Sequence, residues 1–116
     1  MMWHGGGYAA ALGLVTVRVE SPGLMTLSAA VTEPRTLLPG VWDVVPLAPG
    51  VTIAPQVHAA LVPYALSCAQ GLRMPRATIQ ADDSAPLEAW VSAWRRFTIH
   101  PGTPLALLVA QQVARP

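Results

Sequence analysis

Apolar and polar positions alternate along the chain in short segments that proline and glycine separate. Leu14–Glu20 carries its polar residues on one face and valines on the other, as a half-buried strand does. Leu24–Val31 follows a Ser-Pro-Gly turn, so we expect it to form a hairpin with the first strand. Further strands are predicted at Trp42–Val45, Val51–Ala54, Val57–Val62, Tyr64–Cys68, Ala77–Gln80, Trp90–Ile99 and Leu105–Val113.

Turn signals are so closely spaced that few gaps could hold a helix of ten residues. Many short strands at this spacing are typical of an all-β sandwich or barrel, here with little or no helix. One segment is ambiguous, because a helix start at Ser84–Glu88 precedes apolar residues at helical spacing from Leu87 to Trp94. The local pattern there slightly favours a helix over a strand.

Length and charge exclude several classes of protein. The 116 residues allow one domain, residues 1–116, of which 1–11 could form an extended arm. Charged residues make up 11% of the chain and the net charge is +1, so nucleic acid is not an expected partner. The apolar content argues against disorder, and no apolar run is long enough for a membrane helix. So few charges on a small domain indicate that partners cover part of its surface.

Single reactive side chains do not form a catalytic or metal-binding pattern. The three histidines, His4, His58 and His100, lack the spacing of metal ligands, and we predict neither a metal nor a resident cofactor. Cys68 is expected to be a buried, inert thiol, since it lies in an apolar strand pattern. The Asp82–Asp83 pair is expected to form a solvated turn.

The tryptophans are numerous for so short a chain. We expect two or three of them to pack in the core. For at least one of them, a role in an interface carries the same weight as core packing. The basic pair Arg95–Arg96 is expected to be a solvated strand edge. The candidate interface residues are Trp3, His4, Trp42, Trp90, Trp94 and Arg115.

Four segments in the second half share their order and approximate spacing with motifs of a known family. Leu47–Ile53 is similar to its "Leu-x-Pro-Gly" segment, and Tyr64–Leu72 to the strand that enters its "Pro-Arg-Ser-Gly-Leu" motif. Ile79–Asp82 lies where that family has "Ile-Asp-x-Asp". Phe97–Val109 resembles its "Phe-Thr-Ile-x-x-Gly-Asp-x-Ile-Ala-Gln-Leu-Val" segment. Residues 40–113 therefore resemble the trimeric deoxyuridine triphosphatase (dUTPase) family, whereas the first 40 residues do not.

The resemblance implies a compact all-β "β-clip" barrel, jelly-roll-like and often trimeric. It also implies a strand at Glu88–Phe97, and we follow this against the local helical pattern. The family binds a triphosphate with Mg²⁺ and uses an aspartate to activate water. Asp43 could match the aspartate of its "Gly-Tyr-Asp-Leu" motif.

Several positions depart from the family pattern. Ala69 and Gln70 stand in place of the Arg and Ser that meet phosphate, which removes a cationic fork. Gln80 replaces an aspartate, and Asp83–Ala85 replace the "Tyr-Arg-Gly" that holds the nucleoside. The stretch before Ile79 is also short for the hairpin that reads uracil. These losses favour a protein with the fold but without the catalytic site.

We therefore expect a non-enzymatic homotrimer that docks on a larger assembly, such as the major capsid protein of a bacteriophage, as a decoration or cement protein. The expected location is the virion surface, or otherwise the cytoplasm. A diverged dUTPase-like enzyme is the main alternative, with a site at Asp43, Gln70, Gly71 and Asp82. A cellular module that binds protein or glycan is a second alternative. Pyrophosphate release from dUTP with Mg²⁺ distinguishes the enzyme from the other two.

Overall fold

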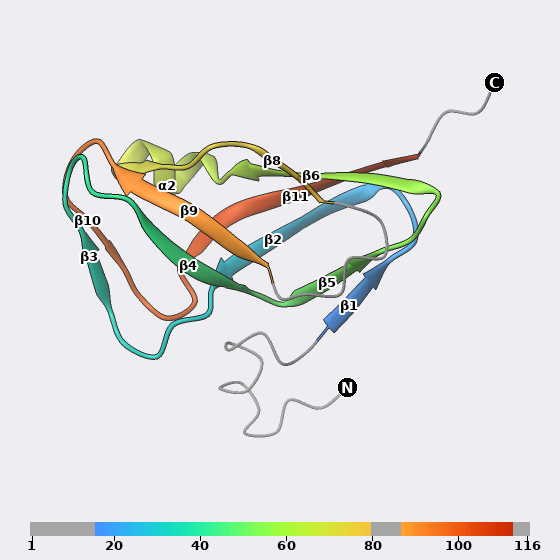
Figure 1. Cartoon of the computed structure of the whole chain (residues 1–116), viewed down its shortest axis with the longest axis horizontal. Coiled ribbons are helices and arrows are strands. Elements are labelled where there is room, and N and C mark those ends of the chain that lie inside the picture. The colour runs from blue at the N-terminus through green and yellow to red at the C-terminus, as the bar shows by residue number, and fades with distance from the viewer. Residues whose placement is uncertain (1–15, 80–86, 113–116) are drawn as a thin grey trace.

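The computed structural model describes residues 16–79 and 87–112, and it is built almost entirely of strands, as the sequence predicts (Figure 1). Seven strands form one curled sheet in the order β7-β9-β4-β2-β11-β6-β8, and two pairs, β1-β5 and β10-β3, complete the fold. The strands are β1 (Thr16–Val19), β2 (Gly23–Ala29), β3 (Arg35–Leu37), β4 (Asp43–Ala48), β5 (Gly50–Ile53), β6 (Val57–Pro63), β7 (Leu72–Arg73), β8 (Ala77–Ile79), β9 (Glu88–Ala93), β10 (Phe97–Ile99) and β11 (Pro104–Gln112).

The long strand β11 lies inside the sheet, where it pairs antiparallel with β2 on one side and with β6 on the other. Alternate residues of these strands point to the concave core, so Leu27, Leu61 and Leu108 are at most 3% exposed. Burial of such leucine side chains contributes about 1.5 to 3 kcal/mol each. The all-β β-clip fold expected from the resemblance is thus confirmed, in the form of a curled half-barrel with one hydrophobic core.

The first strand pairs differently from the prediction. β1 lies parallel to β5, with Thr16 opposite Gly50 and Val19 opposite Ile53. The expected hairpin between β1 and β2 is wrong, because β2 pairs with β11 along one edge and with β4 along the other. Both edges of β2 are therefore paired with other strands, and β1 pairs with β5 instead.

The ambiguous segment forms strand β9 rather than a helix, as the family resemblance implied. Ala89 and Val91 are buried, whereas Glu88 and Trp90 are exposed, which is the alternation of a strand. The strand ends at Ala93, and β10 follows as a separate element, so the single strand expected over Trp90–Ile99 is divided by a turn.

Helix α2 (Ala65–Gln70) replaces the strand expected at Tyr64–Cys68. The segment contains alanine, leucine and glutamine, which favour a helix, and no β-branched residue. Gly71 ends the helix with a positive φ of 133°, a conformation that glycine adopts without strain. Local propensity therefore prevails over the apolar pattern.

Several sequence predictions fall outside the described residues. They concern the arm at residues 1–11, the candidate interface residues Trp3, His4 and Arg115, and the site residue Asp82. Within the described ranges, no helix is both long and apolar enough to cross a membrane.

Candidate functional site

The turn at Gly71 joins α2 to β7 and lies where the sequence resembles the phosphate-binding motif. The Gly71 amide donates to the carbonyl oxygen of Cys68 at 3.2 Å, and the Gly71 carbonyl accepts from the Trp94 amide at 2.9 Å. Ser67 of α2 is buried and donates its hydroxyl to the carbonyl oxygen of Pro104. The Trp94 bond ties the helix end to the turn that follows β9, and the Ser67 bond ties the helix to the start of β11.

Trp94 and Arg95 close over this turn. The indole nitrogen of Trp94 donates to the Cys68 carbonyl at 2.9 Å, and Nε of Arg95 donates to the Gln70 carbonyl at 3.1 Å. The guanidinium carbon lies 5.2 Å from the Trp94 ring centroid, within the range of a cation–π contact. A guanidinium is thereby held beside Gly71, although Ala69 occupies the motif position of an arginine.

Arg95 was expected to be a solvated strand edge; its side chain is exposed but is bonded to the Gln70 carbonyl, a contact that the sequence pattern did not indicate. The turn between β9 and β10 brings the residue to the end of α2, a long-range contact that no local pattern shows. The adjacent Trp94 was the available signal, because a tryptophan beside an arginine favours stacking.

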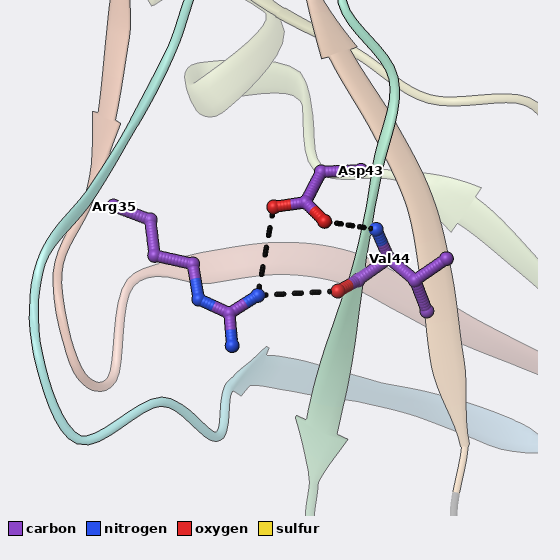
Figure 2. A network of polar contacts seen from close by, with 3 residues as sticks. All are labelled: Arg35, Asp43 and Val44. Carbon is purple, nitrogen blue, oxygen red and sulfur yellow. Dashed lines mark hydrogen bonds and ion pairs between the residues drawn. The ribbon is translucent and has the colours of Figure 1, made fainter.

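Asp43 begins β4 and is positioned by Arg35, which begins β3 (Figure 2). Its Oδ1 accepts a hydrogen bond from the Val44 amide at 2.8 Å, and its Oδ2 lies 3.6 Å from Nη1 of Arg35. The same guanidinium nitrogen donates to the Val44 carbonyl at 3.2 Å. The Arg35 and Asp43 side chains remain 42% and 46% exposed, so the carboxylate is oriented yet open to water.

Asp43 and Gly71 lie on the same part of the sheet but do not touch. Asp43 is opposite Val91 on β9, and Gly71 bonds to Trp94 on the far side of that strand. Two strand spacings and three residues of rise separate them, which is roughly 10 Å in each direction. A ligand that contacts both within one chain must therefore span on the order of 14 Å.

The remaining predicted residues are at the surface. Trp42, Trp90 and Trp94 are 48%, 60% and 49% exposed, so the core interpretation is wrong for all three. Trp42 and Trp90 lie on neighbouring segments, since Val44 pairs with Trp90 and Trp42 is two residues from Val44. Leu38 and Val41, which are close to Trp42 in the chain, are also large and exposed, and these two residues together with Trp42 and Trp90 are called here the Trp patch. Gln70 is exposed, whereas Gly71 is buried.

Other reactive groups are isolated. Cys68 is half-buried and unpaired by a disulfide, and burial raises the pKa of its thiol. Across residues 16–79 and 87–112, no three His, Cys, Asp or Glu side chains gather to hold a metal ion.

No protein-family model matches the chain. Curated proteins do match it. The deoxyuridine 5'-triphosphate nucleotidohydrolase of Xanthomonas oryzae pv. oryzae (strain PXO99A) is 36% identical to this chain over 104 residues. The match covers 83% of this chain and 66% of the relative, and the enzyme of Xanthomonas euvesicatoria pv. vesicatoria matches to the same extent. The chain belongs to the dUTPase-like family. It spans just under two thirds of the length of these relatives.

Solved dUTPases share the fold of this dUTPase-like chain. A mutant of the Staphylococcus bacteriophage 80alpha dUTPase with dUpNHpp has a TM-score of 0.65 at 14% identity, covering 82% of this chain and 84% of that one. The dUTPase from phage phi11 of S. aureus has a TM-score of 0.63 at 14% identity, covering 80% and 78%.

These relatives correct the functional expectation. The relatives and structural neighbours named above are dUTPases, so the expected non-enzymatic capsid decoration or cement protein is wrong, and the enzymatic alternative is the better supported one. Nothing in the comparisons supports a capsid partner. The expectation relied on the replaced motif residues, whereas the chain as a whole is similar to dUTPases.

Proposed function

We propose that this dUTPase-like protein hydrolyses dUTP to dUMP and pyrophosphate. The observation that carries the proposal is the 36% identity to deoxyuridine 5'-triphosphate nucleotidohydrolases across 83% of the chain. The fold that the chain shares with phage dUTPases supports it.

Asp43 is the group we assign to water activation. Arg35 and the Val44 amide hold its carboxylate in one orientation, and its exposure leaves room for water. In the reaction water attacks the α-phosphorus and forms a new P–O bond while the α–β phosphoanhydride bond breaks. Pyrophosphate leaves with the bridging oxygen, and a proton of the attacking water passes to the carboxylate. A positioned base of this kind contributes roughly 100-fold to 10,000-fold in rate.

Arg95 is the cation we assign to the phosphates. Its stacking on Trp94 and its bond to the Gln70 carbonyl restrict the guanidinium before substrate arrives. A preorganised arginine binds phosphate oxygens through charge-assisted hydrogen bonds, so it can serve where the motif arginine is replaced by Ala69.

The family implies Mg²⁺, and the residues present fit an ion that enters with the triphosphate. Mg²⁺ is ordinarily held by one or two carboxylates together with phosphate oxygens and water. Asp43 supplies one such carboxylate, and no larger ligand cluster exists among the described residues. When bound, the ion would neutralise part of the phosphate charge.

We also propose that the protein works as a homotrimer. Asp43 and the Gly71 turn of one chain lie on the order of 14 Å apart, and a neighbouring subunit can supply further groups. The Trp patch is the surface we assign to self-association, because its four side chains are large, apolar and exposed.

The test is pyrophosphate release from dUTP and Mg²⁺ by the purified chain. We expect turnover by the natural sequence and a loss of about 100-fold or more in Asp43→Asn. Glu33→Gln is the matched control, because it removes an exposed carboxylate outside the site. Absence of pyrophosphate from the folded natural chain would overturn the proposal, as would full activity in Asp43→Asn.

A further inference from the structure

A hollow of about 210 Å³ lies at the seam between β1 and the sheet strands β2 and β11. β1 pairs with β5 rather than with β2, so the chain separates there from the strand that follows it (Figure 1). The described residues that line the hollow belong to β1, β2, β11 and the turn between the first two. Asp43 and the Gly71 turn lie on β4 and beside β7, so the hollow is separate from the site assigned to hydrolysis.

The strand register explains why there is space at this seam. Gly23 of β2 lies directly opposite Ala110 of β11, and the next pair on the same face is Met25 with Leu108. A Cβ atom on Gly23 would meet no heavy atom within 4 Å outside its chain neighbours. The small pair Gly23–Ala110 therefore leaves the space open, and the longer side chains of Met25 and Leu108 give it an apolar lining.

Two opposite charges also line this apolar space. Arg18 of β1 and Glu20 just after it are two residues apart, so their side chains share one face of the chain. Nε of Arg18 lies 3.4 Å from Oε1 of Glu20, and the Gln56 amide donates to the Glu20 carbonyl at 3.4 Å. The two charged side chains are 46% and 67% exposed, so the Nη donors of Arg18 and the second carboxylate oxygen of Glu20 are accessible to a ligand.

We propose that this hollow binds a free α-amino acid with a branched apolar side chain, such as leucine. The apolar side chain would fill the space beside Gly23, where its removal from water favours binding. The α-carboxylate would accept hydrogen bonds from the Arg18 guanidinium, and the α-ammonium group would donate to the Glu20 carboxylate. The proposal does not depend on whether the chain hydrolyses dUTP.

The size and the charges of the hollow favour this ligand over others. Its volume is below the range of about 300 to 1,000 Å³ that is common for drug-sized ligands, so a smaller molecule fits it better. A ligand with one charge would pair with only Arg18 or only Glu20. A zwitterion pairs with both, and its single apolar side chain matches the single apolar space.

An NMR titration of the full chain, labelled at its methionine methyl groups, with L-leucine tests this assignment. Met25 lines the hollow, whereas Met74 is buried between β7 and β8 and does not line it. We expect a saturable shift of the Met25 methyl resonance and an unchanged Met74 resonance. No shift of the Met25 resonance would overturn the proposal.

Three variants locate the binding. Arg18→Gln and Glu20→Gln should each weaken it about tenfold or more, since a hydrogen bond to a charged group contributes that much. Gly23→Leu fills the space and should abolish binding, while urea unfolding shows that the variant is folded. Arg73→Gln and Glu33→Gln are the matched controls, because both remove an exposed charge outside the hollow, and they should bind leucine as the natural chain does.

Two analogues of leucine test the requirement for both charges. 4-Methylpentanoate lacks the ammonium group and 3-methylbutylamine lacks the carboxylate, so each should bind at least tenfold more weakly than leucine. Equal binding of either analogue, or leucine binding that Arg18→Gln and Glu20→Gln leave unchanged, would overturn the proposal. Leucine binding that persists in folded Gly23→Leu would do so as well. The pyrophosphate assay is independent of these outcomes, so either proposal can fail alone.

Discussion

The backbone carbonyl oxygen of Arg95 lies 2.9 Å from the position that a Cβ atom on Gly71 would occupy. Gly71 is also held at a φ of 133°, which L side chains rarely adopt. The glycine thus permits the close approach between the end of α2 and the β9–β10 turn, and this approach is what places the Arg95 guanidinium on Gln70.

Gly71→Ala is therefore expected to destabilise the protein by about 2 to 3 kcal/mol, because backbone strain and a clash with a carbonyl act together. Gly102→Ala is the matched control: its φ is also positive, at 85°, but nothing lies within 4 Å of the added methyl. It should cost only about 1 to 2 kcal/mol. Urea unfolding of both variants measures the difference, and equal losses would show that the Arg95 contact is unimportant.

Arg95→Gln should weaken dUTP binding, since it removes the cation beside the Gly71 turn while keeping a polar side chain. We expect KM to rise about tenfold with a smaller change in kcat, because the charge-assisted hydrogen bonds that we propose between the guanidinium and the phosphates would be lost. Arg96→Gln removes the neighbouring charge, which is exposed, and should leave KM unchanged. Steady-state kinetics at fixed Mg²⁺ compare them; a similar KM in both variants would contradict the role of Arg95.

The two exposed tryptophans of β9 and its turn should respond differently to truncation. Trp90 is 60% exposed in the Trp patch, so Trp90→Ala should change the free energy of unfolding of the isolated subunit by less than about 1 kcal/mol. The same variant should shift the sedimentation profile from oligomer to monomer. Trp94→Phe keeps the ring but loses the bond to the Cys68 carbonyl, and should cost about 1 kcal/mol in stability. An unchanged oligomer in Trp90→Ala would remove the Trp patch from the interface.

Much of the fold could be predicted because period-two alternation marks each half-buried strand. The pattern located β2, β6 and β11, which form most of the sheet. It could not assign partners, so β1 was paired with β2 rather than with β5. It also could not separate a short apolar strand from a short helix, which explains α2.

The site was less predictable, because its contacts join segments far apart in the chain. Asp43 was found through the resemblance, but nothing in the local pattern marked Arg35 as its partner, since the two meet only through the fold of the segment between β3 and β4. Arg95 was likewise 25 residues from Gln70, the residue whose carbonyl it contacts. A sequence shows that a motif residue has been replaced, but it does not show which residue from a distant turn lies beside the motif in the folded chain.

The thiol of Cys68 provides a test that depends on pH. Burial raises its pKa in the folded protein, so the unfolded chain ionises first as the pH rises. Above about pH 8.5 the unfolded state therefore binds fewer protons, and the stability of the folded state falls with increasing pH. Below that value both states carry the neutral thiol and its contribution is constant.

Two measurements check this behaviour. Alkylation by iodoacetamide at pH 8 should be slower for the folded chain than for the urea-unfolded chain, because less thiolate is present. In urea unfolding between pH 7 and pH 10, Cys68→Ala should lose less stability than the natural chain, since the variant lacks the ionising group. Equal alkylation rates together with parallel stability profiles would show that the thiol is fully solvated, and that the end of α2 opens more readily than its contacts with Trp94 and Arg95 imply.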